Sequence, residues 1–206
     1  MAGASANSGN HRRYVPGPPQ LAGFVLAGGE SRRMGRDKAL LEIDGQPLVE
    51  RIALRVKEAA GSVVIVGDPE KYASLGFPVV PDRIAGLGPL GGLLTALEES
   101  QAEWNLMVAC DMPAIKANTL VRLVHAIGNS GYARAIVPVS ERGDEPLCAL
   151  YHRECLPEVR RAIASNSLKM NDLTAELKAV RVTGFDAGVF SNVNRPAEWS
   201  AYKASS

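Results

Sequence analysis

The stretch from Leu26 to Lys38, LAGGESRRMGRDK, carries the side chains best suited to chemistry in this sequence. A Gly-Gly pair lets backbone N–H groups approach phosphate oxygens closely, because no Cβ keeps the ligand away. Cationic side chains nearby can neutralise what those amides hold. The formal net charge is only +1, so the cluster does not reflect a generally basic chain. The stretch therefore predicts a phosphate-binding loop, with its positive charge on Arg32, Arg33, Arg36 and Lys38.

Two other interpretations of this stretch are weaker. It is not a Walker A motif, because Lys38 is followed by Ala39 and the glycine spacing differs. A solvated basic loop would be the better interpretation of a lone Gly-Gly pair. The apolar run before the glycines and the clustered cations favour the phosphate site.

A second group of glycines, GLGPLGG at 86–92, suggests different chemistry. Gly86, Gly88 and Gly91 match the dinucleotide fingerprint G-x-G-x-x-G, and Asp111 follows at about the expected distance. The fingerprint should follow its strand directly, whereas the apolar run before it ends near Val80. An NAD-dependent dehydrogenase using these glycines stays as a less favoured alternative.

Polar side chains follow several apolar runs. Asp111 ends the run NLMVAC, where it could face a ligand crevice or cap a helix ahead of Pro113, and the sequence alone does not separate these roles. Asp82, after Pro81, is by itself best interpreted as a turn residue. Asn192 and Asn194 alternate in an extended segment and could face one ligand. Asn194 fits a helix cap equally well.

These residues must be positioned by strands and helices that alternate along the chain. Apolar runs predict strands at 21–27, 63–66, 77–80, 105–110, 134–139, 147–151 and 180–185. Helical spacing predicts helices between Pro47 and Gly61, at 93–100, 119–128 and 156–164, and from Pro196. The alternation favours an α/β fold, a three-layer sandwich around a mostly parallel sheet.

Composition bounds the class of protein. With 206 residues and 46% hydrophobic residues, we expect one domain at 21–206 behind a flexible tail at 1–20, which is rich in Gly, Ser, Asn and Pro. The near-zero net charge gives no case for nucleic-acid binding, and no apolar run is long enough to span a membrane. The tail has no apolar core of a signal peptide, and the cysteines at 110, 148 and 155 form no CxxC pair. We therefore expect a cytoplasmic protein with reduced cysteines.

The pattern L-A-G-G-x-S-x-R-M-G-x-D-K resembles the signature of nucleotidyltransferases, in particular the molybdenum cofactor guanylyltransferases of the MobA type. Further parts of that family's pattern follow in order, so the resemblance covers essentially residues 21–200. These parts are Asp82, GPLGG at 88–92, CDMP at 110–113, EPL at 145–147 and NVNRP at 192–196.

The resemblance implies transfer of GMP from GTP to molybdopterin cofactor with Mg²⁺, on a Rossmann-like nucleotidyltransferase fold. Further partners would be molybdoenzymes or cofactor-delivery proteins. Asp111 would hold the metal, and the catalytic residues would be Asp111, Lys38 and Arg33. Nucleotide contacts would come from Leu26, Ala27, Gly28, Gly29, Lys38, Gly67, Asp82 and Asp111. Acceptor contacts would come from Gly88, Pro89, Leu90, Gly91, Asn192 and Asn194.

Two positions bear on which nucleotide is used. Gly67 stands where the family usually has a nucleotide-contacting asparagine, so Asp68 or a backbone group would have to replace that contact. The sequence reads LAGG, whereas related cytidylyl- and uridylyltransferases commonly read LAAG, and Gly28 would leave room for a guanine. A transferase that uses CTP or another phosphorylated acceptor, and a nucleotide-binding regulator without turnover, remain alternatives.

Overall fold

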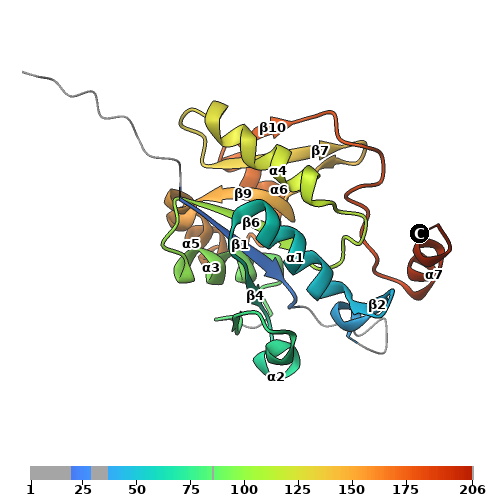
Figure 1. Cartoon of the computed structure of the whole chain (residues 1–206). Coiled ribbons are helices and arrows are strands. Elements are labelled where there is room, and N and C mark those ends of the chain that lie inside the picture. The colour runs from blue at the N-terminus through green and yellow to red at the C-terminus, as the bar shows by residue number, and fades with distance from the viewer. Residues whose placement is uncertain (1–19, 29–36, 85, 206) are drawn as a thin grey trace, which may run out of the picture.

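A central sheet of eight strands organises the computed structural model, which describes residues 20–28, 37–84 and 86–205 (Figure 1). The strand order is β10-β7-β9-β6-β1-β4-β5, and β8 pairs with the end of β7. A separate two-stranded hairpin is formed by β2 and β3. The strands are β1 (Leu21–Leu26), β2 (Glu42–Ile43), β3 (Gln46–Pro47), β4 (Val64–Val66), β5 (Val79–Val80), β6 (Trp104–Ala109), β7 (Ala135–Ser140), β8 (Gly143–Asp144), β9 (Cys148–His152) and β10 (Val180–Val182).

The sheet is mostly parallel, as the alternation of strands and helices predicts. Strand β1 pairs in parallel with both β4 and β6, β5 continues in parallel from β4, and β10 lies parallel to β7. Strand β9 is antiparallel and lies between β6 and β7. The carboxyl ends of β1 and β6 therefore meet at one edge of the sheet, with Leu26 opposite Ala109.

Helices cover both faces of the sheet and make the three-layer sandwich (Figure 1). They are α1 (Leu48–Ala60), α2 (Pro69–Tyr72), α3 (Pro89–Glu99), α4 (Ala117–His125), α5 (Leu156–Ala164), α6 (Met170–Glu176) and α7 (Pro196–Ser205). The short 3₁₀ segments are η1 (Lys38–Leu40), η2 (Ala73–Leu75), η3 (Ala126–Asn129) and η4 (Arg153–Cys155).

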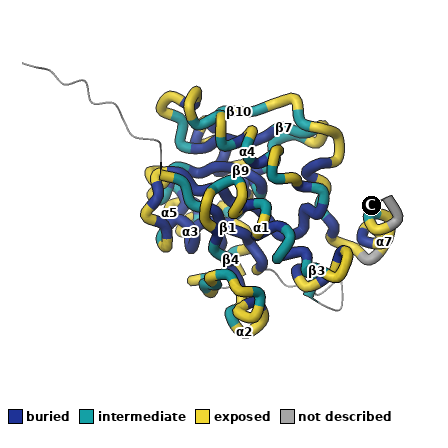
Figure 2. The backbone as a smooth tube through the Cα atoms, in the orientation of Figure 1, coloured by how far each residue is buried: buried dark blue, intermediate teal, exposed yellow. Residues whose placement is uncertain are grey.

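Two apolar cores separate the layers, because successive strand residues face opposite sides. In β1, Val25 joins the core under α1 and α4, whereas Phe24 and Leu26 join the core under α3, α5 and α6. Figure 2 shows the buried backbone running through the centre, with exposed residues at the periphery. Each large aliphatic side chain buried in this way contributes about 1.5–3 kcal/mol.

Several local predictions hold and others need correction. The Asp44-Gly45 turn is present, with φ of 54° and 77°, and Gly61 ends α1 in the left-handed conformation. Helix α3 begins at Pro89 rather than after the glycines, so Gly92 lies inside it. Proline suits the first turn of a helix, and glycine at 92 reflects close packing instead, because a Cβ there would lie 2.9 Å from Leu26 Cδ2. The short α2 and α6 were not predicted from the sequence.

The predicted tail at 1–20 lies outside the described residues except for Gln20, so the division into tail and domain stays a prediction. Within the described residues, we find no helix with the length and apolar character needed to cross a membrane. The cysteines at 110, 148 and 155 are free and buried.

Candidate active site

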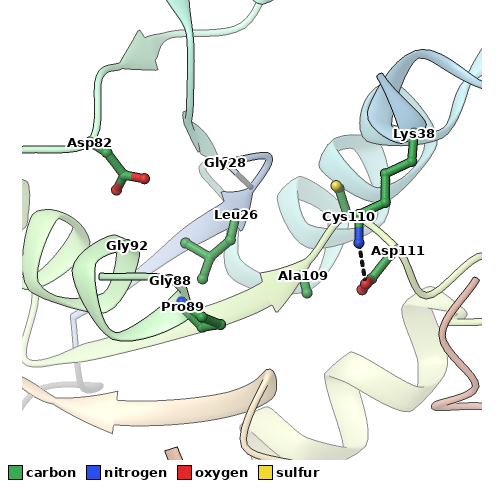
Figure 3. Close-up of a pocket in the computed structure, with 10 residues that line it drawn as sticks. All are labelled: Leu26, Gly28, Lys38, Asp82, Gly88, Pro89, Gly92, Ala109, Cys110 and Asp111. Carbon is green, nitrogen blue, oxygen red and sulfur yellow. Dashed lines mark hydrogen bonds and ion pairs between the residues drawn. The ribbon is translucent and has the colours of Figure 1, made fainter. Parts of the chain in front are cut away.

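The loops that follow β1 and β6 enclose a cavity at the carboxyl edge of the sheet (Figure 3). Its volume is about 90 Å³, below the roughly 300–1,000 Å³ typical of pockets for drug-sized ligands, so a whole nucleotide would extend past these walls. The cavity brings together seven of the residues predicted for the site. Its lining consists of Leu26, Gly28, Lys38, Asp82, Gly88, Pro89, Gly92, Ala109, Cys110 and Asp111.

One end of the cavity holds a lysine between two oxygen acceptors. The Lys38 Nζ atom lies 2.7 Å from Asp111 Oδ2 and 3.1 Å from Asn194 Oδ1. Residues from three distant parts of the sequence thus meet at one point. The Asn194 side-chain oxygen accepts from Lys38, so the start of α7 is supported by another group. The Glu198 carboxylate instead accepts from the backbone N–H groups of Asn194 and Arg195.

Asp111 faces the cavity and is not a helix cap. Its side chain is only 9% exposed, and Oδ1 is buried without a hydrogen-bond partner among the described residues. The next helix, α4, begins six residues later behind Lys116, so the capping interpretation is wrong. The Asp111 carbonyl accepts from the Val193 N–H at 2.9 Å, which holds the C-terminal loop against the end of β6. A buried, incompletely paired carboxylate oxygen suits a hard cation.

Asp82 stands at the opposite end of the cavity (Figure 3). Its Oδ1 is also buried without a partner in the described structure. Burial raises the pKa of this carboxyl group, and the nearby Thr95 hydroxyl lowers it in part. A Cβ on Gly28 would lie 2.7 Å from Asp82 Oδ2, so glycine at 28 is what allows the carboxylate to approach β1. Asp82 is therefore more than the turn residue that its sequence context favours.

The second glycine group supplies one wall of the cavity. Gly88 has a φ of 59° and precedes the first residue of α3, and both Gly88 and Pro89 line the cavity. The Leu90 side chain is fully buried in the core, so any ligand contact there would use its backbone. Gly91 packs against the preceding loop, where a Cβ would lie 3.2 Å from the Ile84 carbonyl oxygen.

Other predicted residues lie away from the cavity walls. The Gly67 N–H donates to the Val80 carbonyl, and a Cβ there would lie 2.8 Å from the Tyr72 ring. The proposed substitute, Asp68, caps α2 by accepting from the Glu70 N–H. The Ala27 N–H donates to the Val66 carbonyl. Asn192 is half-buried and its Oδ1 has no partner in the described part of the chain.

Part of the predicted site lies outside the described residues. Gly29 and Arg33 belong to the segment 29–36, together with Arg32 and Arg36. Their predicted roles in phosphate binding therefore stay predictions.

Tyr72 and Asp37 contribute to the site but were not predicted as site residues. The buried Tyr72 hydroxyl lies 3.0 Å from the Ala27 carbonyl oxygen and 2.9 Å from Asp37 Oδ2. Asp37 in turn accepts from the Ala39 N–H and starts the 3₁₀ turn that carries Lys38. Tyr72 thus joins the described residues on either side of 29–36. Asp37 is part of the signature, but nothing in the local pattern marks Tyr72.

Cys110 lines the cavity without being a suitable nucleophile. Burial raises the pKa of its thiol to about 12, and the Asp111 carboxylate adds to this effect. A thiol with such a pKa stays protonated near neutral pH, and the thiolate is the reactive form.

In the described residues there is also no group of three or more His, Cys, Asp or Glu side chains that could hold a metal ion.

Comparisons with known proteins show the family to which the chain belongs. A family model described as a MobA-like NTP transferase domain matches residues 23–180. The chain is similar to a probable molybdenum cofactor guanylyltransferase of Deinococcus radiodurans, with 35% identity over 86% of this chain and 91% of that protein. It is also 30% identical to a molybdenum cofactor guanylyltransferase of Shewanella loihica, over 87% of this chain and 94% of that one.

A solved structure gives the same result for the fold. The crystal structure of molybdopterin-guanine dinucleotide biosynthesis protein A from Archaeoglobus fulgidus superposes with a TM-score of 0.75 at 25% identity. The match covers 89% of this chain and 97% of that one. The resemblance in the signature, the family model and the relatives agree, and the chain belongs to the MobA-like NTP transferase family.

Proposed function

We propose that this protein transfers GMP from GTP to molybdopterin cofactor, giving the guanine dinucleotide form of the cofactor and pyrophosphate. One observation carries the proposal: a single cavity has a buried carboxylate oxygen at each end, on Asp82 and Asp111, that finds no hydrogen-bond partner among the described residues. Buried polar atoms in proteins are nearly always paired, so each oxygen calls for a donor or cation from a ligand. A guanine at one end and a metal-bound triphosphate at the other satisfy both.

Asp82 suits the guanine end. Guanine presents two adjacent donors, its ring N1–H and its exocyclic amine, and a carboxylate can accept from both. Cytosine presents its exocyclic amine beside a ring nitrogen that is itself an acceptor. A carboxylate facing cytosine would therefore gain one hydrogen bond and oppose one lone pair, so Asp82 favours GTP over CTP.

Asp111 suits the metal end. Carboxylate and phosphate oxygens are the ligands that Mg²⁺ prefers, and Asp111 Oδ1 has no partner in the part of the chain that the structure describes. A bound Mg²⁺ would neutralise charge on the triphosphate and polarise its phosphorus–oxygen bonds. The Lys38 ammonium already lies against Oδ2, so the Asp111 carboxylate has a cation beside it before any ligand binds.

The chemical step needs positioning and charge neutralisation rather than a protein nucleophile. A phosphate oxygen of molybdopterin attacks the α-phosphorus of GTP, and the bond from that phosphorus to the bridging oxygen of the β-phosphate breaks. Pyrophosphate leaves with the bonding electrons. Lys38 stabilises the charge that develops on the leaving group, and Arg33 acts with it in this proposal.

The acceptor would bind on the side of the cavity formed by Gly88, Pro89 and Asn194. Two features support this placement. Gly88 and Pro89 expose the start of α3 to the cavity, and Asn194 reaches Lys38 from the C-terminal loop. Molybdopterin is proposed as the acceptor because the relatives are named molybdenum cofactor guanylyltransferases. Delivery proteins or molybdoenzymes that receive the product are further proposed partners.

The test is pyrophosphate release with each of the four nucleoside triphosphates and MgCl₂, with and without molybdopterin. The proposal predicts release with GTP that depends on molybdopterin and is abolished by EDTA. Equal or greater release with CTP would favour the cytidylyltransferase alternative. Tight GTP binding without release would indicate a regulator, and NAD binding in place of GTP would favour the dehydrogenase alternative.

A further inference from the structure

The segment between β5 and α3 carries Asp82 and is fastened to α3 at one buried hydroxyl. The Thr95 side chain is fully buried in α3, and its Oγ1 accepts from the Arg83 N–H at 3.1 Å. Arg83 directly follows Asp82, so this hydrogen bond sets the backbone position from which the Asp82 carboxylate projects. Ile84, the next described residue of the segment, is an exposed large hydrophobic residue.

The same hydroxyl also connects to the glycines that begin α3. Thr95 Oγ1 lies 3.1 Å from the Gly91 carbonyl oxygen, to which it can donate. It also lies near the Asp82 carboxylate, whose pKa it lowers. A hydroxyl has one hydrogen, so Thr95 donates either to Gly91 or to Asp82 while it accepts from Arg83.

Surface ion pairs around Arg83 cannot replace this contact. The Arg83 guanidinium lies 3.2 Å from Glu98 Oε2 and 2.6 Å from Glu99 Oε1, and its side chain is 49% exposed. Exposed ion pairs contribute little and are screened by salt. The Thr95 hydroxyl is fully buried, so its hydrogen bond to the Arg83 N–H is less open to competing water than these ion pairs, and it is the contact that ties the Asp82 segment to α3.

We propose that Thr95 is a positioning residue for base selection: through the Arg83 N–H, its hydroxyl holds the backbone from which the Asp82 carboxylate reaches the edge of the guanine, and so sets the preference for GTP over CTP. This inference rests on the proposed function, in which Asp82 contacts the base. Thr95 itself touches neither the triphosphate nor the acceptor, because it is buried within α3. Its loss should therefore alter nucleotide recognition far more than the chemical step.

The test compares Thr95→Val, which keeps the shape and removes the hydroxyl, with Thr95→Ser, which keeps the hydroxyl. Thr174→Val is the matched control, because Thr174 is also a fully buried helical threonine whose hydroxyl donates to a carbonyl within its own helix. For Thr95→Val we expect KM for GTP and the dissociation constant of GTP without acceptor to rise about tenfold. We expect kcat and the dissociation constant of CTP to change by less than about twofold.

Rescue and stability separate positioning from a structural role. Thr95→Ser should restore the preference of wild type for GTP over CTP, and Thr174→Val should keep it while losing a similar amount of thermal stability. If Thr95→Val does not fold, Thr95→Ala carries the same expectation. A hydroxyl-free variant that keeps the wild-type preference, or one that weakens GTP and CTP equally, would overturn the inference. A wild-type protein without preference for GTP would instead refute the proposed function on which it rests.

Discussion

Adding one methyl group at Gly28 should displace the Asp82 carboxylate and weaken the preference for guanine. An ideal Cβ at this position lies 2.7 Å from Asp82 Oδ2, whereas ordinary van der Waals contact begins at 3.4 Å. The oxygen must therefore move by the difference, 0.7 Å. A hydrogen bond of about 2.9 Å to guanine would lengthen to about 3.6 Å, which is no longer a hydrogen bond.

The size of the effect follows from the bond that is lost. A hydrogen bond to a charged group contributes about 1.5–3 kcal/mol, so kcat/KM for GTP should fall by about 10- to 100-fold. CTP would lose less, because it makes only one such bond. Gly28 does not have a positive φ, so backbone strain adds nothing. Fitting the extra methyl group into this space lowers the free energy of unfolding by at least about 1 kcal/mol, which lowers Tm by about 2–4 °C for a chain of this size.

The assay measures kcat/KM for GTP and CTP in wild type, Gly28→Ala, Asp82→Ala and the double variant. If Gly28→Ala acts through Asp82, it should have little further effect once Asp82 is alanine. Gly128→Ala is the control, because a Cβ there meets nothing within 4 Å. A stable Gly28→Ala variant with an unaltered GTP to CTP ratio would refute this reasoning, as would additive effects in the double variant.

Three further predictions test the rest of the site. Asp111→Asn should lower kcat by at least about 100-fold in the presence of MgCl₂ with a Tm within a few degrees of wild type, and near-normal Mg²⁺-dependent turnover would remove Asp111 from the metal site. Lys38→Ala should lower kcat and also cost about 1 kcal/mol of stability, because it leaves the buried Asp111 carboxylate without its cation; unchanged kcat and KM would exclude Lys38 from catalysis. The ratio of GTP to CTP affinity should fall as the pH drops through the raised pKa of Asp82, because only the anion accepts from both guanine donors. This fall should occur at a higher pH than an exposed carboxyl group would give. A ratio that stays constant down to pH 4 would contradict this role.

The sequence predicted those site residues that belong to a local sequence motif. Lys38 and Asp111 follow local patterns, and the parallel order of β1 and β6 brings the ends of these two strands together. Sequence could not decide whether Asp111 caps a helix, because that depends on where α4 begins. It also could not place Asn194 beside Lys38, since the two are far apart in the chain and meet only through the C-terminal loop.

Contacts made by single buried hydroxyl groups could not be predicted from the sequence. Thr95 lies in a helix that the sequence predicts, but its bond to the Arg83 N–H depends on how the preceding loop crosses α3. Tyr72 lies in α2, which the sequence did not predict, and its hydroxyl donates to the Ala27 carbonyl just after β1, although α2 follows the signature in the chain. The antiparallel position of β9 is similarly non-local, because it depends on pairing with β6 and β7 on either side.

The most direct test of guanylyl transfer follows the α-phosphate of GTP into the product. The wild-type protein is incubated with molybdopterin, MgCl₂ and GTP labelled with ³²P at either the α- or the γ-phosphate, and the cofactor is then separated from free nucleotide. The account predicts that the label enters the cofactor from α-labelled GTP only, in an amount equal to the pyrophosphate released. Label that enters from γ-labelled GTP, or α-label that stays entirely in free nucleotide while GTP is consumed, would contradict it.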